Sequence, residues 1–268
     1  MKTFREKAAL WIHHSKVSGM KLAARMGFKK YREMVDGPAT DMTNDRATKR
    51  FIKHYIQPED TAVRKWVELG NGKTYLDVGA GSGRFSKIVL ESGASRVAAV
   101  DINPKCIEVL NLRFKEESRF EAKLADATLL PYDNNSFDRV LCLGNTLGNM
   151  FYAWPGVENS FQAEVLREMM RVAKECVVLT LQRKSALRIA LQYYRMNGYD
   201  VYSYENGIAR LREKHVTPHG SVYTSESRSQ KFDPEDILKI VEKAGISQKC
   251  VDISPINKYN WFVVIRKS

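Results

Sequence analysis

Long apolar runs, cysteine pairs and metal-ligand spacings are all missing from this sequence. No apolar run approaches the roughly 20 residues that a helix needs to cross a bilayer. The 4 cysteines include no C-x-x-C pair, so we predict free thiols in a reducing, cytoplasmic compartment rather than disulfides or a zinc site. The 5 histidines have no metal-ligand spacing either, and no metal site is predicted. With 268 residues, of which 44% are hydrophobic, the chain can build the core of a soluble enzyme.

Acidic residues are also scarce, above all near the N-terminus. The formal net charge is +12, and the first 32 residues carry nine Lys and Arg side chains with Glu6 as their one acid. Apolar residues such as Trp11 and Phe28 recur at helical spacing in the same stretch. Three interpretations stay open. The stretch packs as a helical extension on the core or on a second copy of the chain in a homodimer; it offers a basic surface to RNA or an acidic protein; or it lies on an anionic membrane surface.

The most informative segment runs from residue 74 to residue 101. Residues 75–78 predict a buried strand, residues 84–90 a helix, and residues 97–100 a second strand that ends at Asp101. Between the first strand and the helix stand Gly79, Gly81 and Gly83, which allow a tight turn and let a ligand approach the backbone closely. Asp101 follows Gly79 by 22 positions, near the spacing of about 20 at which a carboxylate meets a ribose. The segment therefore predicts a site for a nucleoside-containing cofactor.

Three details separate this glycine turn from those of NAD and flavin enzymes. The spacing is G-x-G-x-G rather than G-x-G-x-x-G, and Asp77 lies inside the strand two positions before the first glycine. A further carboxylate, Asp126, follows a predicted strand at residues 120–124, where it can meet an adenine edge. An ordinary hydrogen-bonding role for Asp77 within the turn is compatible with a role in cofactor binding.

The segments 76–83, 100–103, 125–127 and 136–142 closely resemble, in order, the first three motifs and the fourth strand of class I S-adenosylmethionine-dependent methyltransferases. The resemblance covers roughly residues 72 to 182. It implies S-adenosyl-L-methionine as the cofactor and an α/β fold, a Rossmann-like seven-stranded methyltransferase sheet, mostly parallel with an antiparallel edge. The cofactor-binding residues that the resemblance and the turn together predict are Asp77, Gly79, Ala80, Gly81, Ser82, Gly83, Asp101, Ile102, Asp126, Ala127 and Leu143.

The order of predicted elements divides the chain into four parts. Residues 1–71 form a basic helical extension, 72–183 the cofactor-binding core, 184–231 an insertion, and 232–268 the completion of the core. In the extension we predict one helix from Asp45 to Ile56, stopped near Pro58, and another that Asp60 caps. In the insertion, short antiparallel strands surround Asn206-Gly207, a strong hairpin signal. Its position after the fifth strand of the core predicts a lid over the acceptor pocket.

The methyl acceptor is argued from residues that follow the fourth and fifth strands of the core. The chain lacks the Asn/Asp-Pro-Pro-Tyr motif of enzymes that methylate exocyclic base nitrogens, and the Pro-Cys nucleophile of pyrimidine carbon-5 methylases. Residues 143–146 resemble a segment of glycine- and sarcosine-type small-molecule N-methyltransferases, and Arg183 matches an arginine that holds a substrate carboxylate there.

These matches make Asn145 and Arg183 the candidate catalytic residues. A capping role for Asn145 and a solvent-facing Arg183 remain alternatives. We predict in-line methylation of a small amine or amino-acid-like molecule, because a neutral amine needs positioning more than strong base catalysis. The alternative is an RNA or protein methyltransferase that docks its polymer on the basic N-terminal region.

Overall fold

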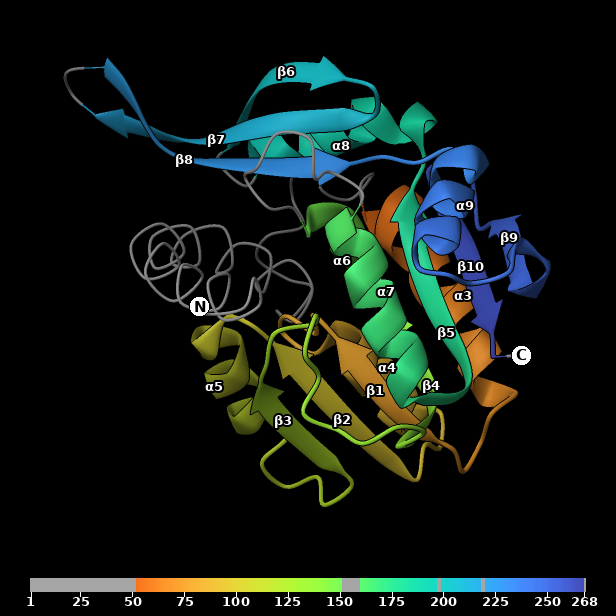
Figure 1. The fold of residues 1–268 in the computed structure, drawn as a ribbon. Coiled ribbons are helices and arrows are strands. Elements are labelled where there is room, and N and C mark those ends of the chain that lie inside the picture. The colour runs from red at the N-terminus through yellow and green to blue at the C-terminus, as the bar shows by residue number, and fades with distance from the viewer. Residues whose placement is uncertain (1–51, 151–159, 197–198, 218–219, 268) are drawn as a thin grey trace, which may run out of the picture.

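The computed structural model describes residues 52–150, 160–196, 199–217 and 220–267. Seven strands form one sheet in the order β3-β2-β1-β4-β5-β10-β9 (Figure 1). The first five strands along the chain run parallel, and β10 pairs antiparallel with both β5 and β9. The predicted fold class, including the antiparallel edge hairpin, is confirmed. The bounds are β1 Thr74–Val78, β2 Arg96–Asp101, β3 Phe120–Leu124, β4 Phe137–Cys142, β5 Ala173–Gln182, β9 Val251–Pro255 and β10 Asn260–Arg266.

Helices cover both faces of this sheet because its central strands are apolar on both sides. In β1, Leu76 and Val78 belong to one buried cluster, whereas Tyr75 belongs to the cluster on the opposite face. The first cluster includes side chains of α7 and α9, and the second includes side chains of α3 and α4. The helical bounds are α3 Gln57–Glu68, α4 Arg84–Glu91, α5 Pro104–Arg113, α6 Thr146–Asn149, α7 Ser160–Val172, α8 Leu187–Met196 and α9 Pro234–Lys243, with single turns η1 Ile52–Ile56, η2 Lys184–Ala186 and η3 Gln248–Cys250.

The helix before the sheet differs from the prediction. Pro58 does not stop a helix; it lies in the first turn of α3, where its missing N–H costs no hydrogen bond. Asp60 does not cap the helix either. It lies inside the first turn, and its carboxylate pairs with Arg84 of α4, 24 residues further along the chain. The predicted helix from Asp45 begins outside the described residues, as does the basic stretch before it.

The insertion forms a second sheet of three antiparallel strands, in the order β6-β7-β8. These strands are β6 Tyr199–Glu205, β7 Ile208–Thr217 and β8 Gly220–Gln230, and α8 packs against β6. Asn206 and Gly207 have φ values of 50° and 83°, which confirms the predicted turn. Figure 1 shows this sheet at the top of the view, above α6, and β8 contacts α6 directly. The predicted strands are present but longer than the sequence pattern suggested.

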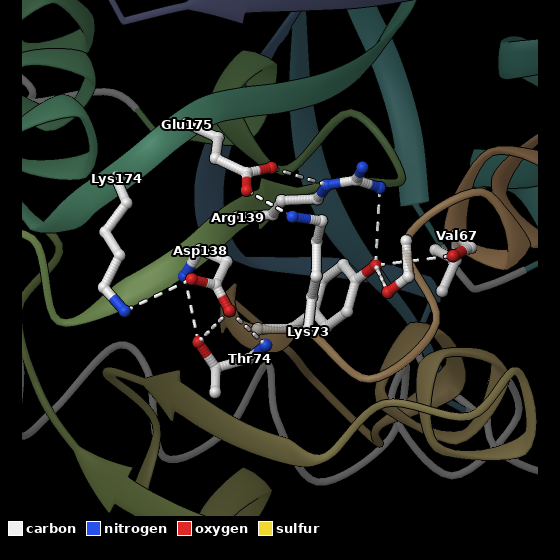
Figure 2. Close-up of polar contacts among 9 residues, drawn as sticks. Val67, Lys73, Thr74, Asp138, Arg139, Lys174 and Glu175 are labelled. Carbon is white, nitrogen blue, oxygen red and sulfur yellow. Dashed lines mark hydrogen bonds and ion pairs between the residues drawn. The ribbon is translucent and has the colours of Figure 1, made fainter.

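The amino ends of β1, β4 and β5 are joined by paired charges (Figure 2). The Asp138 carboxylate accepts hydrogen bonds from the backbone N–H and hydroxyl of Thr74, at 2.8 and 2.9 Å. Glu175 pairs with both Lys73 and Arg139. The Tyr75 hydroxyl donates to backbone carbonyls that include that of Gly70, at 3.2 Å. Each of these charged side chains is paired, so ion pairs and hydrogen bonds hold the three strands together at this edge.

Within the described part of the chain, none of the helices has the length and apolar content that a bilayer span requires. Its four cysteines are free thiols, three of them buried. Among the described residues, no three His, Cys, Asp or Glu side chains cluster in a way that could hold a metal ion.

Candidate functional site

The glycine turn lies at the carboxyl end of β1, where its backbone is fixed by β2. The N–H groups of Gly79 and Ala80 both donate to the carbonyl of Val100, at 2.8 and 3.1 Å. Gly79 has φ +70°, and a Cβ there would lie 2.3 Å from a methyl carbon of Thr146. At Gly83, with φ +81°, a Cβ would lie 2.6 Å from the ring of Phe114. Both positions therefore require glycine, for conformation and for space.

Asp101 ends β2 beside this turn, and backbone donors fix its carboxylate. One carboxylate oxygen accepts from the N–H of Gly81 and the other from the N–H of Asn103, each at 2.9 Å. Burial raises the pKa of Asp101, while these two hydrogen bonds oppose the shift. The thiol of Cys106 and the backbone of Ile102 add further hydrogen bonds to this carboxylate. The adjacent Ile102 is 38% exposed, an apolar surface beside an oriented acceptor.

Asp77 and Ser82 are buried polar residues at the glycine turn. The carboxylate of Asp77 accepts from the hydroxyl of Ser86 in α4 at 2.7 Å, which ties β1 to that helix. Burial raises the pKa of Asp77 to about 6, against the effect of this hydrogen bond. The Ser82 hydroxyl is buried without a partner among the described residues, while the Ser82 carbonyl accepts from Arg113. Asp77 thus has the internal role that the sequence left open.

Asp126 lies next to Asp101, as the strand order requires. The N–H of Ala125 donates to the Asp101 carbonyl at 3.0 Å, so the chain leaves β3 alongside the end of β2. The Asp126 carboxylate accepts from the N–H and hydroxyl of Thr128, at 3.0 and 2.8 Å. Ala127 packs against the larger buried cluster. The predicted cofactor residues of β1, β2 and β3 therefore meet at one edge of the sheet.

The turn after β4 is held by β5 and by the second sheet. The Asn145 side-chain carbonyl accepts from the N–H of Gln182 at 2.9 Å, and its amide donates to the carbonyl of Gln230 at 3.1 Å. Asn145 is buried at φ +62° and makes no side-chain cap to α6. The Leu143 side chain is buried in the apolar core, and its carbonyl accepts from the Thr146 hydroxyl at 2.6 Å. Asn145 thus connects three segments that are far apart in the sequence.

Arg183 is placed differently from the prediction. Its guanidinium donates to the carbonyl of Asn257 at 3.0 Å and lies over the ring of Trp261, 3.9 Å from the ring centre. Both partners belong to the β9–β10 hairpin, on the side of β5 opposite β4. A guanidinium engaged there does not face the turn at Asn145, because β5 lies between them. The arrangement does not support a substrate-carboxylate grip by Arg183, and it does not leave the side chain in open solvent.

Two buried polar groups were missed from the sequence. Glu59 of α3 accepts from the Thr180 hydroxyl at 2.5 Å and pairs with Arg84 at 3.0 Å. Lys231, just after β8, is fully buried and donates to the hydroxyls of Tyr194 and Ser229. A lysine in a chain with 43 Lys and Arg residues carries no sequence signal of burial. Glu59 is equally inconspicuous, because its partners lie 25 and 121 residues away along the chain.

Residues 76–176 match the family model of a methyltransferase domain. This range begins in β1 and ends in β5, so it contains the glycine turn, Asp101, Asp126 and Asn145. The insertion and the closing hairpin lie outside it.

Two sequence relatives and one solved structure illustrate the similarity. The demethylmenaquinone methyltransferase of Clavibacter sepedonicus is 30% identical over 178 residues, 66% of this chain and 66% of that protein. A ribosomal RNA small subunit methyltransferase A of Prochlorococcus marinus is 29% identical over 158 residues, 54% of this chain and 56% of that protein.

The crystal structure of magnesium protoporphyrin IX methyltransferase from Synechocystis PCC 6803 with bound SAM superposes with a TM-score of 0.58. Its sequence is 16% identical, over 92% of this chain and 94% of that one. The chain thus spans between about half and two thirds of the length of the two sequence relatives. The named substrates of all three proteins differ from one another, so the similarity identifies the fold and not the acceptor.

Proposed function

Because the chain belongs to the class I S-adenosylmethionine-dependent methyltransferase superfamily, we propose that it transfers the methyl group of S-adenosylmethionine to a small amine. The acceptor lies between the carboxyl edge of the seven-stranded sheet and the insertion. The orientation of Asp101 is the main support for cofactor binding. Backbone N–H groups fix both of its oxygens beside the glycine turn, and ribose hydroxyls would add to or replace its present donors.

The residues of the glycine turn fit the cofactor. Asp101 would accept from the two ribose hydroxyls, and Asp126 would lie near the adenine amino group. Gly79 and Gly81 would face the methionine part, where a Cβ would obstruct a close approach. The exposed side chain of Ile102 offers an apolar contact beside the ribose. When bound, the cofactor supplies a methyl group on a cationic sulfur, which is a good leaving group.

The insertion supports the acceptor half of the proposal. Ligands of open α/β sheets bind outside the carboxyl ends of the strands. The insertion meets that edge at β4, where β8 contacts α6 and Asn145 bonds to Gln230. Such a cover would exclude water and hold a neutral amine in line with the methyl carbon, which is the main requirement of this reaction. The hydrogen bonds of Asn145 hold this site in shape, and a site of fixed shape can position an amine acceptor.

The test separates cofactor binding from acceptor choice. Calorimetric titration with S-adenosylhomocysteine checks the first, with Asp101→Ala as the variant and Asp138→Ala, at the opposite edge, as the control. Release of S-adenosylhomocysteine from S-adenosylmethionine checks the second, with a panel of glycine, sarcosine, putrescine, a demethylmenaquinol and small-subunit ribosomal RNA. We expect turnover with an amine. Turnover with the RNA alone, with an affinity that falls steeply with salt, would contradict the amine acceptor and favour polymer docking.

A further inference from the structure

Lys231 is a buried amine at the junction of the two sheets. The Lys231 side chain is fully buried, and the Lys231 backbone N–H donates to the carbonyl of Gly207 at 2.7 Å. Within the described residues, its Nζ contacts two hydroxyl oxygens and forms no ion pair with a carboxylate. A buried lysine of this kind is costly in its charged form, because nothing replaces the water that the ammonium has lost.

The two hydroxyls around the amine suit both of its protonation states. Tyr194 of α8 lies 2.7 Å from Nζ, and Ser229 of β8 lies 2.8 Å from it. An ammonium can donate to both oxygens, and a neutral amine can accept from either hydroxyl. The amine can therefore gain and lose a proton with no more than a turn of the Ser229 hydroxyl, which donates to Asn149.

Ser229 connects this amine to the turn above the candidate cofactor site. Its hydroxyl lies 2.5 Å from the side-chain carbonyl of Asn149 and 3.3 Å from the side-chain amide of Asn145. Thr146, next to Asn145, is the residue that a Cβ at Gly79 would meet. Two hydrogen bonds thus separate the Lys231 amine from the turn that touches the glycine loop.

The groups around Lys231 leave its charge uncompensated. From the turn after β4, α6 and α7 the neighbouring polar groups are the amides of Asn145, Asn149 and Gln162. From α8 and β6 they are the phenols of Tyr194 and Tyr204. The nearby Lys184 pairs instead with Asp233 and Asp236, which raises its pKa. Burial lowers the pKa of Lys231 to about 7. A neutral amine is also compatible with the cationic sulfonium that the site receives.

We propose that the Lys231 amine, through the Ser229 hydroxyl, takes up the proton that the acceptor must lose before methylation. This inference rests on the proposed function. An amine acceptor enters as an ammonium, and one of its N–H bonds breaks as its proton passes to Ser229. The proton of Ser229, donated to Asn149 before the transfer, turns toward Lys231 and passes to its amine, which becomes an ammonium. The freed lone pair of the acceptor forms the new N–C bond, and the C–S bond breaks with its electron pair on sulfur. The product is a methylated ammonium, and the total charge is unchanged.

The first experiment measures the pH profile of kcat/KM with the panel amine that gives the highest turnover. We expect a loss of activity below about pH 7 in the wild-type chain. Lys231→Met should lower kcat/KM by about 100-fold or more at pH 8 and abolish that acidic limb. Lys231→Arg should not restore activity, because arginine keeps the charge but accepts no proton. The matched control Lys184→Met should keep the acidic limb, and none of the variants should change the affinity for S-adenosylhomocysteine.

Rescue by Lys231→Arg, or an unchanged acidic limb in Lys231→Met, would overturn the inference while leaving methyl transfer to an amine intact. No turnover of any amine by the wild-type chain would instead remove the proposed function. A second measurement needs neither turnover nor a variant. In protein with 15Nζ-labelled lysine, we expect one side-chain signal to titrate near pH 7. Lysine signals that all stay charged to pH 9 would overturn the inference.

Discussion

The pKa values of carboxylates shift in opposite directions at the two edges of the seven-stranded sheet. At the amino edge, hydrogen bonds from Thr74 and Lys174 outweigh partial burial and hold the pKa of Asp138 below its ordinary value. The hydrogen bond from Lys73 does the same for Glu175. At the carboxyl edge, burial raises the pKa of Asp77 and Asp101. The charged forms are thus favoured at one edge and disfavoured at the other.

The amino edge of the sheet stabilises the fold, whereas the carboxyl edge is suited to binding a ligand. A paired carboxylate at the amino edge is stabilised by groups of the protein itself, so it has little to gain from a ligand. Among the described residues, the buried carboxylates Asp77 and Asp101 at the carboxyl edge accept hydrogen bonds but have no cationic partner. Perturbed ionisation of this kind is common where a ligand supplies the missing partners.

The largest expected effect concerns Asp101. Asp101→Ala should weaken S-adenosylhomocysteine binding by about 3 kcal/mol, because two ribose hydroxyls lose a charged acceptor. Calorimetric titration measures the loss, with Asp101→Asn as a variant of the same size. Unchanged affinity in Asp101→Ala would show that the carboxyl edge differs from the amino edge for reasons other than the cofactor.

The second effect is the dependence of stability on pH at Lys231. A lysine whose pKa is lowered to about 7 is penalised in the folded state below that pH, and the penalty shrinks as the pH rises toward about 10.4, the ordinary lysine pKa. Relative to Lys231→Met, the wild-type chain should therefore gain about 2.5 kcal/mol of unfolding free energy between pH 6 and pH 9. Urea denaturation at both values measures this gain. An equal difference between the two proteins at pH 6 and pH 9 would contradict a neutral, buried amine.

The third effect tests the amino edge. Asp138→Ala removes the acceptor of the Thr74 N–H and hydroxyl and one partner of Lys174, and it should lower the unfolding free energy by about 2 kcal/mol. Urea denaturation checks the loss, and calorimetry should find an unchanged affinity for S-adenosylhomocysteine. A weakened affinity would mean that the two edges are coupled through β1 and β4.

The smallest effect concerns Arg183. Because its guanidinium lies over Trp261 and bonds to a hairpin carbonyl, Arg183→Lys should cost about 0.5–1 kcal/mol of stability. The KM of the amine acceptor should not change. A clear rise in KM with unaltered stability would restore the substrate contact that the sequence resemblance implied and would require a different side-chain position in the complex.

The sequence predicts those parts of the molecule that depend on neighbours along the chain. The seven strands and the Asn206-Gly207 turn follow from local apolar patterns and turn residues. The arrangement of Asp101 beside the glycine turn is also predictable, because parallel strands bring their carboxyl ends to one edge. The prediction that Pro58 stops a helix was wrong because proline occurs both after the end of a helix and in its first turn. The sequence pattern does not distinguish these two positions.

The remaining features depend on partners far away in the chain. Asp60 pairs with Arg84 instead of capping its helix, and Asn145 bonds to Gln182 and Gln230. The burial of Lys231 results from the packing of the second sheet against the first, which no local pattern encodes. Single-residue roles at the acceptor side were therefore less predictable than the cofactor side, where the turn sequence itself carries the geometry.

The insertion leaves and rejoins the core at adjacent points. The N–H of Phe232 donates to the carbonyl of Gln182 at 2.7 Å, and Arg183 and Phe232 form a parallel bridge. Residues 184–231 can therefore be exchanged as a cassette between two backbone positions that stay hydrogen-bonded neighbours. A chain of this design can acquire a new acceptor by replacing the cassette while β1, β2 and the glycine turn stay as they are. The incoming segment would have to rebuild the contacts with the core, which include those of Gln230 with Asn145 and Gln162 and that of Ser229 with Asn149.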